Sequence, residues 1–90
     1  MPERRVTVAT PIGLHARPAM IFAQAAAAAT VPVRIGRPGG EPVDAASILS
    51  VLGLDVRGGE DVVLGADGEG ADEALDTLAA LLSRNLDRPG

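Results

Sequence analysis

The chain has 90 residues and contains no cysteine, no lysine, no tryptophan and no tyrosine, with one phenylalanine and one histidine. Without cysteine, disulfides cannot stabilise the fold and a thiol mechanism is excluded. Eight arginines against twelve acidic residues give a net charge of −4, which disfavours binding to a phosphate backbone. The lack of aromatic side chains also disfavours stacking of single-stranded bases. We therefore expect no nucleic-acid partner.

Long apolar runs are absent as well. No stretch approaches the roughly 20 apolar residues of a membrane helix. Arg4 and Arg5 precede an apolar region in the manner of a secretory signal, but Pro11, His15 and Pro18 interrupt that region. We expect no targeting segment, no membrane insertion and a cytoplasmic location.

The apolar residues that are present predict four strands and three helices in the order βαββαβα. Strands are expected around residues 6–8, 33–35, 43 and 62–64, and helices over about 16–30, 47–53 and 72–84. A sheet with one apolar face buries it under helices, so the pattern indicates an α+β sandwich. We expect one domain over residues 1–90, with an aliphatic core around Phe22.

The glycines between the second and third strands do not form a nucleotide-binding loop, because that motif ends in Gly-Lys-Ser/Thr and the chain has no lysine. No cluster of metal-binding side chains is recognisable either, and the acidic segment 67–72 lacks the ligand spacing of a calcium loop. We expect neither a cofactor nor a metal.

The segment Gly13-Leu14-His15-Ala16-Arg17-Pro18 holds the only histidine of the chain. Proline is tolerated in the first turn of a helix, which predicts a helix start at about Ala16. The backbone N–H groups of Ala16 and Arg17, together with the helix dipole, would then form an anion site beside the imidazole, to which Arg17 adds a fixed charge. A neutral imidazole is a nucleophile, so His15 is a candidate phosphoryl acceptor. The alternative is an ordinary surface or core histidine.

These residues resemble the active-site motif of the HPr phosphocarrier proteins of the bacterial phosphoenolpyruvate-dependent sugar phosphotransferase system. A second match lies at 47–54, Ser-Ile-Leu-Ser-Val-Leu-Gly-Leu, which is similar to the family's regulatory-serine segment. The resemblance covers essentially the whole chain. It implies an open-faced β-sandwich, with an antiparallel sheet in the strand order 1-4-2-3 and three helices on one face.

The resemblance also implies a function and partners. Phosphorylated enzyme I would donate a phosphoryl group to His15, at Nδ1 by family likeness, and enzyme IIA domains would accept it for sugar uptake and phosphorylation. The chain is not expected to be an autonomous enzyme, because the partner surface can complete the positioning and charge stabilisation that phosphoryl transfer requires. We expect a monomer that docks only briefly.

On the helix over 47–53, the spacing predicts that Val51 and Leu54 face the core, that Ile48 is partly buried, and that Leu49 and Leu52 point outward. With Met20, the residues Ile48, Leu49 and Leu52 would form a docking patch. The alternative is the ordinary apolar exposure of a small domain.

Ser47 has two interpretations, a helix N-cap or a phosphorylation site. The second would add a serine kinase/phosphorylase and transcriptional regulators as partners. Two positions depart from the family pattern. Ile12 stands where a small polar residue is frequent, and Ala46 replaces a basic residue frequent before the serine.

Two alternative functions remain at this point. One is an HPr-like carrier of another phosphorelay, such as nitrogen-related signalling or dihydroxyacetone phosphorylation. The other is a non-catalytic regulatory module that binds through the apolar patch while His15 stays unmodified.

Overall fold

The computed structural model describes residues 2–86. Its elements occur in the predicted order βαββαβα. The strands are β1 (Glu3–Thr7), β2 (Val33–Gly36), β3 (Val43–Asp44) and β4 (Asp61–Ala66), and the helices are α1 (Ala16–Ala27), α2 (Ile48–Gly53) and α3 (Ala71–Leu82). None of the helices in this part of the chain is long and apolar enough to cross a membrane.

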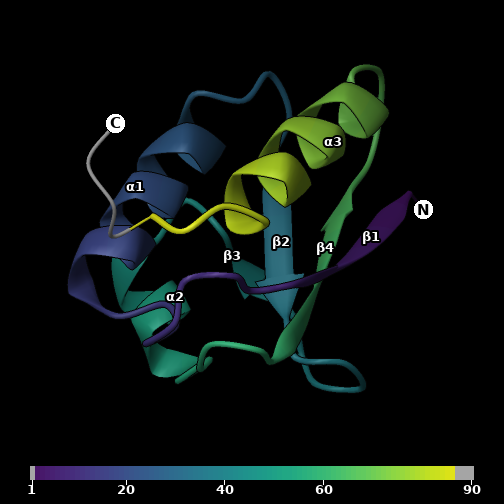
Figure 1. Cartoon of the computed structure of the whole chain (residues 1–90). Helices are drawn as coiled ribbons and strands as arrows, with labels where there is room; N and C mark the ends of the chain where they lie inside the picture. The colour runs from purple at the N-terminus through teal and green to yellow at the C-terminus, as the bar shows by residue number, and fades with distance from the viewer. Residues whose placement is uncertain (1, 87–90) are drawn as a thin grey trace.

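The strands form one sheet in the order β1-β4-β2-β3, in which every neighbouring pair is antiparallel. Val6 lies opposite Val62, and Ile35 lies opposite Leu64. Alternation places these apolar side chains on the same face. The helices lie over one face of the sheet (Figure 1), which confirms the open-faced β-sandwich.

The core lies between the sheet and the helices and is aliphatic apart from Phe22. Its largest fully buried side chains include Phe22, Ile35, Leu64, Leu75, Leu78 and Leu82. The leucines of α3 recur at helical spacing and pack against β1 and β4. Ala74 and Leu81 are half-buried at the margins of this face.

Three helix ends differ from the sequence prediction, one of them the end of α3, which lies at Leu82 rather than near residue 84. α1 ends at Ala27 rather than near Thr30, because the chain tightens there: the Ala29 N–H donates to the Ala26 carbonyl, three residues back, at 3.2 Å. α3 begins after Gly70, which adopts a left-handed conformation with φ of 91° and offers no side-chain cap. The apolar spacing thus indicated the helices but not their exact ends.

Candidate functional site

His15 lies at the N-cap of α1, with extended backbone dihedrals. Its carbonyl accepts the first helical hydrogen bond, from the Ala19 N–H at 2.8 Å. The helix therefore starts at Ala16, as predicted. His15 is half-buried, whereas Ala16 and Arg17 are exposed and Pro18 is buried. The structure thus places the imidazole and the following two residues at an accessible helix end.

The first turn of α1 is not acidic. It contains no acidic residue, and the His15 side chain makes no capping hydrogen bond to the backbone of α1. The N–H groups of Ala16 and Arg17 precede the first helical hydrogen bond, which Ala19 donates. The positive end of the helix dipole and the exposed Arg17 therefore lie beside His15, an arrangement that favours an oxyanion there.

The loop before α1 is held in place by a second loop. The Leu14 N–H donates to the Val56 carbonyl at 2.9 Å. Gly13 has φ of 95°, and a Cβ on it would overlap the Val56 carbonyl and the backbone of Arg57. Glycine is required here both for the left-handed dihedral and for this close approach. The position of His15 therefore depends on the loop that follows α2.

The two loops enclose a shallow depression of about 370 Å³, which we call the His15 depression. It is lined by Ile12, Leu14, His15, Ala16, Leu52, Asp55, Val56 and Arg57. Asp55 and Arg57 were not among the site residues predicted from the sequence. Tertiary packing brings them close to His15, so no local sequence pattern indicates them. Ile12, one of the departures from the family pattern, lies on the rim with 68% of its surface exposed.

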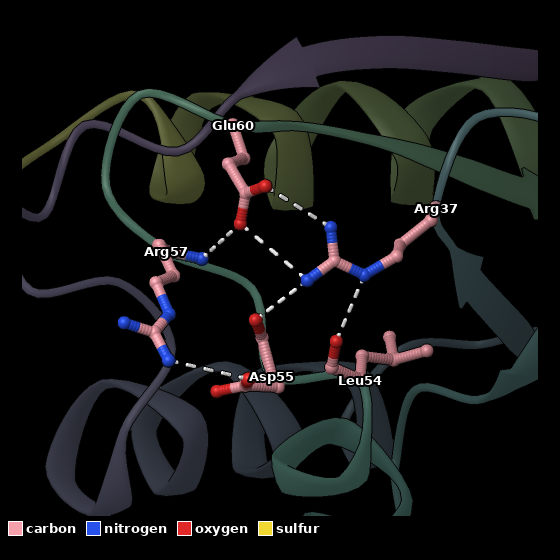
Figure 2. Close-up of polar contacts among 5 residues, drawn as sticks. All are labelled: Arg37, Leu54, Asp55, Arg57 and Glu60. Atoms are coloured by element: carbon pink, nitrogen blue, oxygen red, sulfur yellow. Dashed lines mark hydrogen bonds and ion pairs between the residues drawn. The ribbon is translucent and has the colours of Figure 1, made fainter.

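A polar cluster in and around this second loop includes Asp55 and Arg57, which line the depression (Figure 2). The Arg37 guanidinium donates to the carboxylate of Glu60 and to two backbone carbonyls, and the Arg57 N–H also donates to Glu60, at 2.7 Å. The Arg57 N–H, and after it Arg37, hold the pKa of Glu60 below its ordinary value, because both stabilise the carboxylate.

The predicted docking patch is only partly exposed. Leu49 exposes 79% of its surface and Met20 exposes 45%. Ile48 and Leu52 are half-buried and pack against the core. The prediction that Leu54 faces the core while Leu52 points outward was wrong in this distinction, because both are half-buried and pack against the core. In a six-residue helix that lies close to the 10–15 loop, Leu52 lines the wall of the His15 depression.

Ser47 caps α2, as predicted from its position. Its Oγ accepts from the Ser50 N–H at 3.3 Å. The exposed Ala46 donates its N–H to Asp44 Oδ1 at 2.9 Å. The capping interaction is sufficient to explain the serine structurally.

Histidine, cysteine and carboxylate side chains do not gather into a metal-binding group anywhere in residues 2–86. The chemistry available at the site is therefore that of an imidazole, backbone N–H donors and arginine, at the N-terminus of a helix on an open-faced β-sandwich.

Comparison with known proteins agrees with this description. Residues 2–84 match the family model described as the PTS HPr component phosphorylation site. The phosphocarrier protein HPr of Streptomyces coelicolor is 55% identical over 87 residues, covering 97% of this chain and 94% of that protein. HPr of Haloferax volcanii is 46% identical over 82 residues, 90% of this chain and 92% of that one.

The structural comparison gives the same result. A crystal structure of HPr from Thermoanaerobacter tengcongensis superposes with a TM-score of 0.88 at 30% identity, covering 100% of both chains. The chain belongs to the HPr family, the phosphocarrier proteins of the phosphotransferase system.

Proposed function

We propose that His15 of this chain accepts a phosphoryl group from phosphorylated enzyme I, at Nδ1 by family likeness, and passes it to enzyme IIA domains. The observation that carries the proposal is the position of His15 at a helix N-terminus without acidic residues in its first turn. An N–P bond forms on the imidazole as the donor's bond to phosphorus breaks. The same step in reverse, on a different partner, releases the group to the acceptor.

Ala16 and Arg17 stabilise the phosphorylated state in this proposal. Their N–H groups supply donors to the phosphoryl oxygens, and the Arg17 guanidinium supplies charge. The transferred group gains these interactions when it arrives on His15, so the site favours the phosphorylated product. Partners complete the in-line geometry, and the chain acts as a carrier rather than as an enzyme.

The remaining roles follow from the carrier function. Met20, Ile48, Leu49 and Leu52 contribute to docking, with the two exposed side chains, Met20 and Leu49, making the outer contacts. Residues 1–90 act as one cytoplasmic, monomeric domain without a cofactor, and Ser47 is a site where phosphorylation would regulate docking. Support for the docking role is the exposure of Leu49 on the helix that Ser47 caps.

The deciding experiment is incubation with phosphoenolpyruvate and enzyme I, followed by intact mass measurement. We expect one acid-labile, base-stable phosphoryl group on the wild-type chain and none on His15→Ala. That variant should keep its fold, because the imidazole caps no N–H of α1 and is only half-buried. An unchanged wild-type mass with several competent enzyme I donors, or a group that survives acid, would contradict the proposal.

A further inference from the structure

Arg37 follows the last residue of β2 and reaches across to the loop after α2 (Figure 2). Its Nε donates to the Leu54 carbonyl at 3.0 Å, and its Nη2 donates to the Asp55 carbonyl at 2.6 Å. These carbonyls lie just past the C-terminus of α2, where backbone oxygens lack helical partners and the helix dipole favours a cation. One guanidinium thus holds two consecutive carbonyls of this loop.

The other side of the guanidinium faces Glu60. Nη1 and Nη2 donate to its two carboxylate oxygens at 3.2 and 3.4 Å. Glu60 also accepts from the Arg57 N–H. The Arg37–Glu60 pair therefore hydrogen-bonds to the loop at Leu54 and Asp55 and again at Arg57. The planar guanidinium can donate to all of these acceptors at once, whereas a lysine ammonium cannot point its N–H bonds in the same directions.

The loop is strained where Arg37 holds it. Asp55 has φ of 50°, and among residues 2–86 no other non-glycine residue has a positive φ. A non-glycine residue in this region needs support from its surroundings. The short bond from Arg37 to the Asp55 carbonyl supplies that support.

The near side of the same loop contacts the site directly. The Val56 carbonyl accepts from Leu14, and the backbone from Val56 to Arg57 packs on Gly13. Gly58 is equally close to the Pro11 carbonyl, where a Cβ would overlap it. A displacement of residues 54–57 would therefore displace the 10–15 loop that ends in His15. It would also move Asp55 and Arg57, which line the His15 depression.

We propose that Arg37 is a positioning residue of the phosphoryl-transfer site, which together with Glu60 fixes residues 54–57 against the loop that presents His15. Arg37 acts through that loop and does not touch the reacting atoms. The inference rests on the proposed function of His15 for its effect on transfer, while its structural part concerns the coupling of two loops.

The test measures phosphorylation of His15 against enzyme I concentration for wild type, Arg37→Gln, Arg37→Lys and Glu60→Gln. Arg4→Gln is the matched control, because Arg4 also combines ion pairs, to Asp72 and Asp76, with a hydrogen bond to a backbone carbonyl, that of Glu3, and none of these partners belongs to the loop. We expect Arg37→Gln to lower the rate at saturating donor on the order of tenfold, with a smaller change in the half-saturating concentration. Arg37→Lys should restore only part of the rate, since it keeps the charge and loses the fork.

A second measurement records backbone amide shifts of Gly13, Leu14 and His15 by NMR, which requires no phosphoryl transfer. We expect these signals to move in Arg37→Gln and Glu60→Gln and to stay in place in Arg4→Gln. If the wild-type chain takes no phosphoryl group, the proposed function fails, and the amide shifts alone decide the coupling.

Two results would overturn the positioning role. One is a wild-type rate with unmoved Gly13–His15 signals in the Arg37 and Glu60 variants. The other is full rescue by Arg37→Lys, which would show that charge alone matters. Should Arg37→Gln fail to fold, Glu60→Gln carries the test, because it leaves the bonds from Arg37 to the Leu54 and Asp55 carbonyls available.

Discussion

The N-termini of the two long helices are built in opposite ways. α3 has Asp72 and Glu73 in its first turn, where negative charge is favourable. α1 has no acid in its first turn, and Arg17 lies there instead. A cation at a helix N-terminus is unfavourable for the helix. α1 therefore lacks the local stabilisation that Asp72 and Glu73 give to α3.

The surroundings of α3 extend this contrast. Arg4 on β1 pairs with Asp72 at 3.1 Å and with Asp76 at 2.9 Å. The hydrogen bonds that Arg4 donates to Asp76 and to Asp72 raise the pKa of Arg4 above its ordinary value. Asp72 at the start of α3 is thus paired within the chain, whereas the first turn of α1 holds a basic residue and no acidic one. This contrast supports the proposal that the start of α1 receives an anionic group.

After the loss of His15 itself, the largest effect on transfer is expected from Arg17→Ala. Loss of one charged hydrogen-bonding partner costs about 1.5 to 3 kcal/mol, which corresponds to a decrease in transfer rate on the order of ten- to a hundredfold. Stability should be unchanged or slightly higher, because Arg17 is exposed and opposes the helix dipole. Transfer kinetics with purified donor and acceptor, together with urea unfolding, measure the two effects. Wild-type transfer would show that the backbone N–H groups suffice.

An intermediate effect is expected at the third helix end, where Ser47 caps α2. Ser47→Asp places a negative charge beside Leu49, and Leu49→Glu places one within the docking patch. Each should slow phosphorylation of His15 by enzyme I several-fold, because the partner must bury or oppose that charge. Thermal stability should change little, since aspartate is as good an N-cap as serine.

Neutral substitutions at the same two positions separate the effect of the added charge from the effect of losing the original side chain. Ser47→Asn keeps the cap and Leu49→Gln keeps the polarity, so both should transfer faster than their charged counterparts. If Ser47→Asp and Leu49→Glu both match wild type, the surface around Leu49 is not the docking site and Ser47 is a helix cap alone.

The sequence predicted the elements well because their causes are local. Helical spacing of Leu75, Leu78 and Leu82 and the capping position of Ser47 are visible in the chain itself. Of the charged or titratable side chains at the candidate site, only His15 and Arg17 were predicted from the sequence. Asp55 and Arg57 were missed because their proximity to His15 comes from loop packing around Gly13, which no local pattern encodes. Leu52 was misplaced because a six-residue helix is too short for its spacing to define an outer face.

The strand order, by contrast, came from the family resemblance rather than from the strand patterns. Pairing of β1 with β4 joins residues about 58 positions apart, such as Arg5 and Val63. An alternating apolar pattern fixes which face of a strand is buried, but several strand orders satisfy the same pattern.

The smallest effects come from exchanging the charges of the two long helix ends. Ala16→Asp, compared with Ala16→Asn, should raise the free energy of unfolding by about 0.3 to 1 kcal/mol, because an anion is favoured in the first turn. Asp72→Asn should lower it by a similar or smaller amount. Urea unfolding at low and high salt measures both, and salt should shrink each difference.

Only the substitution in α1 should change phosphoryl transfer. Ala16→Asp should accept phosphoryl groups more slowly than Ala16→Asn, because its carboxylate lies where the phosphoryl oxygens would bind. Asp72→Asn should match wild type. Equal transfer by the two Ala16 variants would mean that the open end of α1 has no part in binding the anion.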